Sequence, residues 1–111
     1  MRRPNILLIY TDQLRWDALG VNGNSDVKTP HLDKLASEGL NFTHHFVQHP
    51  LCMPSRVSFL SGRYPSSLGI TRMGVPVPET LQILPHYLRS VGYKTANIGK
   101  LRFLPHANSD H

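Results

Sequence analysis

The sequence predicts an α/β fold in which helices flank a layered sheet, an α/β/α arrangement. Residues 5–10 form a continuous apolar run without helical period, which is typical of a strand buried on both faces. Two later stretches, 29–39 and 52–62, each carry a proline near the start and end on a glycine, as helices do. Shorter strand patterns occur at 40–47 and 93–98. The predicted order along the chain is therefore strand, helix, strand, helix, helix and strand.

Length and composition fit one small globular domain or a piece of a larger one. The 111 residues are 40% hydrophobic and 17% charged, which suits a packed core rather than a disordered tail. A single cysteine excludes an internal disulfide framework, so nothing argues for an oxidising compartment. The opening residues are basic, but the apolar run at 6–10 is too short for a signal peptide or a membrane span. We therefore expect a cytoplasmic protein without a membrane partner.

The formal net charge of +5 does not by itself indicate a nucleic-acid partner. Lysines and arginines are scattered along the chain rather than clustered, and no RNA- or DNA-binding motif accompanies them. The positive potential favours a small anionic substrate instead. We expect no nucleic-acid partner.

The stretch 52–62 carries the most informative chemistry. Pro54 suits the first turn of a helix, where its missing N–H costs nothing, and Gly62 suits the helix end. Cys52 then lies at or just before the helix N-terminus, where the backbone favours negative charge. Arg56 follows four residues later and can turn its guanidinium toward the same place. A nucleophile beside an anion-binding helix end predicts a site for a phosphate or sulfate group. The alternative is that Cys52 is a small buried hydrophobic residue.

Asp12 and Gln13 directly follow the first predicted strand. In open α/β sheets ligands bind at the carboxyl ends of the strands, so Asp12 is where a metal ligand is expected. Both side chains offer the hard oxygen donors that Ca²⁺ and Mg²⁺ prefer. The alternative is that Asp12 only caps a helical turn that starts at Leu14. Residues 17–24 are rich in turn formers and predict a loop.

The stretch 29–39 predicts a helix of the scaffold. Thr29 is a candidate N-cap, Pro30 suits the first helical position and Gly39 suits the end. The apolar side chains of this helix share one face: Leu32, Leu35 and Ala36.

The strand predicted at 40–47 leads toward Cys52. Three histidines in this part of the chain, His44, His45 and His49, raise the alternative of a zinc site that includes Cys52. Their spacing matches no standard zinc motif, and no second ligand pair follows. A strand that leads into an active-site loop is the preferred interpretation.

The remainder of the chain predicts connectors and one more helix. Residues 63–70 indicate a polar loop, and 73–78 indicate a connector rich in glycine and proline. From Thr80 onward apolar residues recur at helical spacing. Pro85 interrupts the pattern, so the helix either starts near Leu84 or is kinked there.

The residues Cys-Met-Pro-Ser-Arg at 52–56 resemble the Cys-x-Pro-Ser-Arg signature of the type I, formylglycine-dependent sulfatases, within the alkaline-phosphatase-like superfamily. Further segments are similar to that family: the stretch after the first strand, the Thr-Pro-x-Leu-Asp-x-Leu-Ala helix that starts at Thr29, and Gly99-Lys100. The resemblance therefore extends well beyond the signature itself.

The resemblance runs from Pro4 to about His106 but covers only the first part of the family's pattern. It implies that residues 1–111 are the N-terminal part of a sulfatase catalytic domain, with the C-terminal remainder absent. The family's later metal ligands and its second lysine cannot be located in this sequence.

In that family a maturing enzyme oxidises the cysteine to formylglycine, and the hydrated aldehyde is the nucleophile. The resemblance implies catalytic roles for Cys52, for Arg56, which stabilises the hydrate, and for Lys100, which contacts the sulfate. It implies that the metal ligands are Asp12, Gln13 and Cys52, and that the metal is Ca²⁺ or else Mg²⁺ or Mn²⁺. The alternative for Lys100 is an ordinary solvated lysine at a strand end.

Three positions depart from the family's pattern. Gln13 stands where many sulfatases have a second aspartate, although glutamine occurs there in some relatives, including phosphonate monoester hydrolases and choline-sulfatase-like enzymes. Arg102 and Leu68 each occupy the place of a common histidine, and His106 is near enough to be considered as a substitute. The expected function is sulfuric ester hydrolysis. The alternatives are hydrolysis of phosphonate or phosphate monoesters on the same scaffold, or a non-catalytic fragment.

Overall fold

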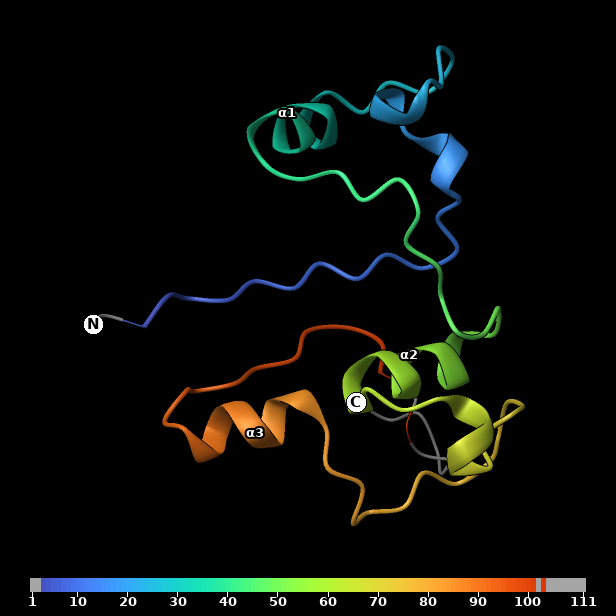
Figure 1. The fold of residues 1–111 in the computed structure, drawn as a ribbon, viewed down its shortest axis with the longest axis vertical. Coiled ribbons are helices and arrows are strands. Elements are labelled where there is room, and N and C mark those ends of the chain that lie inside the picture. Colours follow the sequence, from blue (N-terminus) through green and yellow to red (C-terminus); the bar gives the residue numbers. More distant parts are fainter. Residues whose placement is uncertain (1–2, 102, 104–111) are drawn as a thin grey trace. The chain divides into compact units, whose positions relative to one another are not determined.

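A computed structural model of the chain describes residues 3–101 and 103. The chain divides into two compact units, Met1–His45 and Phe46–His111, and each is described by itself (Figure 1). Within the described ranges all regular structure is helical. None of the helices there is long and apolar enough to cross a membrane.

The first unit begins with an extended segment and continues into three helices (Figure 1). Two of them are single turns of 3₁₀ helix, η1 (Trp16–Ala18) and η2 (Gly20–Asn22). The third is the α-helix α1 (Pro30–Glu38). Its start at Pro30 and its end before Gly39 confirm the helix predicted from the sequence.

The start of α1 is tied to η2 by two hydrogen bonds, and a third joins the two side chains that accept them. The hydroxyl of Thr29 accepts from the Gly20 N–H at 2.8 Å and donates to the Asp33 carboxylate at 2.9 Å. The same carboxylate accepts from the Val21 N–H at 2.7 Å. Thr29 therefore occupies the predicted N-cap position, but its hydroxyl bonds to η2 and to the Asp33 side chain rather than to a backbone N–H of α1. A Cβ atom at position 20 would lie 2.6 Å from the Asp33 carboxylate, so a larger residue there would displace the carboxylate that accepts from Val21.

The second unit contains α2 (Cys52–Ser61), the 3₁₀ helix η3 (Pro65–Leu68) and α3 (Leu84–Ser90). Both η3 and α3 contact α2. The α2 helix ends at Gly62, whose φ of +67° lies in the left-handed region and whose N–H donates to the Ser58 carbonyl at 2.9 Å. This ending is the one that the sequence predicted, because glycine adopts a positive φ without steric cost.

The core of the second unit is centred on Met53, Val57 and Ile70, of which Val57 and Ile70 have no exposed surface. Half-buried apolar residues pack around these three: Leu68, Val75, Val77, Leu81 and Phe103. Pro85 lies in the first turn of α3, as expected for a helix that starts near Leu84 rather than one that is kinked.

The strands predicted at 5–10, 40–47 and 93–98 are not confirmed, because these segments form no hydrogen-bonded strand in the described part of the chain. A strand forms only when its backbone pairs with that of a neighbouring segment in a regular ladder. Their apolar side chains are correspondingly exposed, with Leu7 at 85% and Ile98 at 99%.

The polar loop predicted at 63–70 is wrong in part. Pro65 starts the 3₁₀ helix η3, and the chain then returns so that the Ile70 N–H donates to the Pro65 carbonyl at 2.9 Å. Ile70 is thereby buried beneath α2, which the polar composition around it did not indicate.

Candidate active site

Cys52 is the first residue of α2, at the position that the sequence predicted. Leu51 before it has extended backbone, and its carbonyl accepts the Ser55 N–H at 3.0 Å to begin the helix. Cys52 itself is half-buried, whereas the next residue, Met53, is 2% exposed and belongs to the core. Cys52 therefore lies at the edge of the hydrophobic core. It is also at the N-terminus of α2, where the helix dipole favours negative charge.

Lys100 lies beside Cys52 although 48 positions separate the two residues in the sequence. The Lys100 Nζ is 3.9 Å from the Cys52 Sγ, within the range of a hydrogen bond to sulfur. The lysine side chain is half-buried, which contrasts with the ordinary solvated lysine considered as the alternative. This pairing brings a cationic group next to the one cysteine of the chain.

Arg56 is buried, with 7% of its surface exposed, one turn after Cys52. Its NH1 group donates to the Lys100 carbonyl at 2.9 Å. The sequence predicted a guanidinium turned toward the anion site, and this bond ties the guanidinium to the main chain of Lys100, the residue whose side chain lies beside Cys52. Since a buried cation needs acceptors, this bond both satisfies part of the guanidinium and fixes the segment that carries the lysine.

Asp12 and Gln13 lie on an exposed bend in the first unit. Gln13 has a φ of +52°, a left-handed conformation that few residues other than glycine, asparagine and aspartate adopt. The helix that follows them, η1, begins at Trp16, and its N-cap residue is Arg15 rather than Asp12. Asp12 and Gln13, two of the three candidate metal ligands, therefore belong to the first unit, whereas Cys52 and the other candidate catalytic residues belong to the second.

The chemistry of these two donors fits a hard divalent cation, because one carboxylate and one amide oxygen are adjacent and reachable from solvent. Across residues 3–101 and 103, no group of three or more His, Cys, Asp or Glu side chains is gathered as a metal site would require. Asp12 and Gln13 thus remain two candidate oxygen ligands, fewer than a complete coordination shell requires.

The histidines considered for zinc have protein partners instead. His44 lies 3.0 Å from the Thr43 hydroxyl, and the ring of His45 is tilted against Phe42. His49 bonds through both ring nitrogens to main-chain atoms. The described contacts give the zinc alternative no support.

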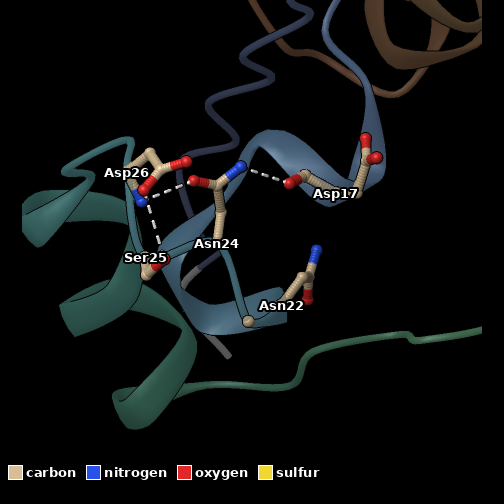
Figure 2. A pocket seen from close by; sticks show the side chains of 6 residues that line it. Asp17, Asn22, Asn24, Ser25 and Asp26 are labelled. Atoms are coloured by element: carbon tan, nitrogen blue, oxygen red, sulfur yellow. Dashed lines mark hydrogen bonds between the residues drawn. The ribbon is translucent and has the colours of Figure 1, made fainter.

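The first unit also has an open hollow of about 280 Å³ beside η2 (Figure 2). Its lining is polar: Asp17, Asn22, Gly23, Asn24, Ser25 and Asp26. The amide of Asn24 spans it, donating to the Asp17 carbonyl at 2.7 Å and accepting from the Asp26 N–H at 3.0 Å. Arg15 donates to the Asp17 carboxylate at 2.9 Å, and this hydrogen bond lowers the pKa of Asp17. These groups stabilise a turn in the predicted loop.

Sequence reasoning missed two relationships near Cys52. The bond from Arg56 to the Lys100 carbonyl has no local signal, because the sequence does not show which main-chain atoms a folded chain brings together. The two main-chain bonds of His49 were also missed. The sequence shows only that a histidine stands three residues before the cysteine. Arg102 and His106, which were considered for the place of a family histidine, lie outside the described residues.

Comparisons with known proteins agree with the resemblance carried by residues 52–56. The family model described as Sulfatase matches residues 4–111. Steryl-sulfatase from Mus musculus is 44% identical over 110 residues, which cover 89% of this chain and 18% of that protein. Ulvan-active sulfatase from Formosa agariphila is 41% identical over 107 residues, covering 96% of this chain and 21% of that protein.

Arylsulfatase from Clostridium perfringens is 41% identical over 108 residues, covering 96% of this chain and 22% of that protein. The chain thus spans about a fifth of the length of the curated relatives it matches. No solved structure matches the chain significantly. Because the family model covers almost every residue, the identification does not depend on the short signature alone, and the chain belongs to the sulfatase family.

Proposed function

We propose that the complete protein carrying this chain hydrolyses sulfuric esters at a reactive centre formed from Cys52, which is oxidised to formylglycine. The observation that carries the proposal is the 3.9 Å approach of the Lys100 Nζ to the Cys52 Sγ at the N-terminus of α2. Because the oxygen of formylglycine takes the position of the Sγ, this distance supports a role for the lysine beside the reacting atom. The sulfatase relatives support an anionic sulfate ester as the substrate.

Each described residue has a chemical task in this proposal. The hydrated aldehyde of formylglycine at position 52 would supply the hydroxyl that attacks the sulfur of the ester, and the alcohol would leave. The N-terminal end of α2 favours the negative charge of the sulfate group. The Lys100 ammonium neutralises the charge that develops on the sulfate oxygens. Arg56 holds Lys100 in place through the 2.9 Å bond to its carbonyl.

Asp12 and Gln13 provide oxygen ligands for a divalent cation in this proposal, either Ca²⁺ or Mg²⁺ or Mn²⁺. Such a cation, when bound, makes a hydroxyl at the reactive centre more acidic. The two side chains bring one negative charge between them, so the affinity depends on further ligands in the complete protein. Position 52, as formylglycine, is the third proposed ligand from this chain.

The proposal also covers the fold of the domain, its maturation partner and its location in the cell. We propose that residues 1–111 are the N-terminal part of a sulfatase catalytic domain with a layered α/β/α sheet. The exposed apolar segments at 5–10 and 93–98 supply strands of that sheet once partner strands are present. The formylglycine-generating enzyme is the expected maturation partner, and a cytoplasmic location stays a prediction.

The test is to produce the complete protein with and without a formylglycine-generating enzyme and to measure both mass and turnover. Maturation lowers the mass of the peptide that contains Cys52 by about 18 Da. Hydrolysis of 4-nitrophenyl sulfate is expected to rise in proportion to the fraction of converted protein. The Cys52→Ala variant is the matched control, because it keeps the fold and removes the convertible thiol. Equal turnover by this variant would contradict the proposal.

Hydrolysis of phosphonate or phosphate monoesters is the second candidate, and Gln13 is the observation that favours it. The amide removes one negative charge from the proposed metal site, which alters the balance between substrates of different charge. Turnover of 4-nitrophenyl sulfate and of a 4-nitrophenyl phosphonate ester should be compared in one preparation. A higher kcat/KM for the phosphonate would favour the second candidate.

The 111-residue chain by itself is expected to be catalytically inactive, since it gathers no complete set of metal ligands within its described ranges. The purified chain should give no metal-dependent hydrolysis of aryl sulfates above the Cys52→Ala background. Measurable turnover that EDTA abolishes would overturn this expectation and would show that the site is complete within the chain.

A further inference from the structure

His49 bonds through both nitrogens of its ring to main-chain atoms, one in Leu51 and one in Thr71. The Leu51 N–H donates to the His49 Nδ1 at 3.1 Å. The His49 Nε2 lies 3.1 Å from the Thr71 carbonyl oxygen. An amide N–H can only donate and a carbonyl can only accept. The two bonds together therefore require the neutral tautomer, with the hydrogen on Nε2 and a lone pair on Nδ1.

The two ends of this bridge belong to parts of the chain that matter for Cys52. Leu51 directly precedes Cys52, and its carbonyl accepts the first hydrogen bond of α2, from the Ser55 N–H. Thr71 directly follows Ile70, which has no exposed surface and packs in the core. The half-buried ring of His49 thus links Leu51, which precedes α2, to Thr71, which follows the core residue Ile70.

We propose that His49 is a positioning residue for the reactive centre at Cys52, which rests on the proposed function of that centre. His49 does not touch the reacting atoms. It acts through Leu51, because a shift of the Leu51 main chain moves the Cys52 Cα relative to the Lys100 ammonium. An error of about 1 Å in such a placement can lower a rate by about 10²-fold.

Substitutions can separate the two halves of the bridge. In the His49→Asn variant the amide oxygen takes the place of Nδ1 and can still accept from the Leu51 N–H, as asparagine does in turns. Its side chain is too short to reach Thr71. The His49→Phe variant keeps a planar ring of similar size and loses both bonds.

His86 offers a matched control in the same unit. Its Nδ1 accepts from the Ile83 N–H at 3.4 Å at the start of α3, so it is also a histidine bonded to the main chain near a helix start. The His86→Phe variant removes a comparable bond away from Cys52. A merely structural effect of losing a histidine would be the same in both variants.

The experiment uses the complete matured protein and 4-nitrophenyl sulfate, with kcat corrected for the formylglycine content of each variant. We expect His49→Phe to lower kcat by about 10- to 100-fold while KM changes less than about threefold, because orientation is lost and binding is not. His49→Asn is expected to recover about half of that loss on a logarithmic scale, since it keeps one of the two bonds. His86→Phe should keep kcat within about twofold of the wild type.

A second measurement does not depend on turnover. In protein produced without the maturing enzyme, the rate at which iodoacetamide alkylates Cys52 is followed by peptide mass spectrometry. Loss of the bridge should raise this rate about tenfold in His49→Phe, which corresponds to one or two lost hydrogen bonds, and should leave it unchanged in His86→Phe.

The outcomes distinguish the two proposals. Wild-type protein that turns over neither sulfate nor phosphonate esters would overturn the proposed function, and the alkylation rates would still show whether His49 fixes Cys52. Wild-type kcat and wild-type alkylation in His49→Phe would overturn the positioning role. Equal losses in His49→Phe and His86→Phe would overturn it as well, since they would reveal a general effect on folding. If His49→Phe does not fold, His49→Asn decides by the same criteria.

Discussion

The Lys100 Nζ lies 3.9 Å from the Cys52 Sγ, and the main chain of Lys100 is bound by an arginine from the helix that Cys52 begins. One helix thus presents the cysteine and holds the lysine. Arg56 and Cys52 are four positions apart and lie on the same side of α2, which allows this double function. The spacing Cys-x-x-x-Arg consequently has a structural meaning in this chain besides any direct contact of the arginine with substrate.

Replacement of Lys100 by methionine tests whether the ammonium beside Cys52 takes part in catalysis. Methionine keeps much of the volume of lysine and removes the charge. We expect kcat of the matured complete protein for aryl sulfates to fall by about 10²- to 10³-fold, as when one donor to a developing negative charge is removed.

Lys94→Met is the matched control for Lys100→Met, because Lys94 is an exposed lysine that precedes Lys100 by six positions. It should leave kcat within about twofold of the wild type. A comparable loss in both variants would assign the effect to net charge rather than to the position beside Cys52.

Truncation of Met53 tests the packing of α2 under the reactive centre. Met53 is 2% exposed, so Met53→Ala leaves a cavity in the core and should lower the free energy of unfolding by about 2–5 kcal/mol. Met73→Ala is the matched control at a position that is 38% exposed, and it should cost less than about 1 kcal/mol. Urea unfolding measures both, and equal costs would contradict the core described around Met53, Val57 and Ile70.

Exchange of Gln13 for aspartate tests the proposed metal site. The substitution adds one negative charge, and aspartate accepts the left-handed backbone at this position, where φ is +52°. We expect the complete protein to bind Ca²⁺ roughly tenfold more tightly, measured by calorimetry, because affinity follows the charge of the ligand set.

Gln48→Asp provides the control for this experiment, since Gln48 is an exposed glutamine whose side-chain amide donates to the nearby Phe46 carbonyl. It should leave the affinity for Ca²⁺ unchanged. An unchanged affinity in Gln13→Asp as well would remove Gln13 from the proposed ligands.

The titration of Asp17 gives a prediction about pH. The hydrogen bond from Arg15 lowers the pKa of Asp17, so the folded state binds this proton less readily than the unfolded state does. The stabilisation is therefore present above the ordinary pKa of aspartate and is lost as the pH falls through the lowered value. Both side chains are exposed, so the effect on stability is small.

Carboxyl-detected NMR should show the pKa of Asp17 rising toward its ordinary value in Arg15→Gln. Lys28→Gln is the control, because the Lys28 ammonium donates to the Ser25 carbonyl instead of to Asp17. A pKa of Asp17 that stays low in Arg15→Gln would show that the ion pair is not its cause.

The sequence predicts the ends of helices well because those ends are local. Pro30 and Gly39 bound α1, and Gly62 ends α2, since the missing N–H of proline and the freedom of glycine act within a single turn. The predicted strand at 5–10 was not confirmed in the described structure for the opposite reason. Its apolar pattern indicates burial on both faces. A strand, however, forms only when two segments pair, and the pattern of one segment does not show which other segment pairs with it.

In the candidate site, too, local features could be predicted from the sequence and long-range contacts could not. The position of Cys52 at a helix start was predicted from Pro54 and Gly62, which are close in sequence. The bond between Arg56 and the Lys100 carbonyl depends on a fold that brings positions 44 residues apart together, and residue types alone do not encode it. The resemblance to sulfatases pointed to Lys100 where local patterns could not.

The burial of α2 has a consequence for how substitutions in this chain are tolerated. The six buried residues of this helix are consecutive: Met53, Pro54, Ser55, Arg56, Val57 and Ser58. A helix on a protein surface would alternate sensitive and permissive positions with a period of 3.6 residues. Saturation mutagenesis should instead give an unbroken block of intolerance across 53–58, while α1, in which no residue is buried, should accept most replacements. Attempts to diversify this protein should therefore spare those six positions as one unit.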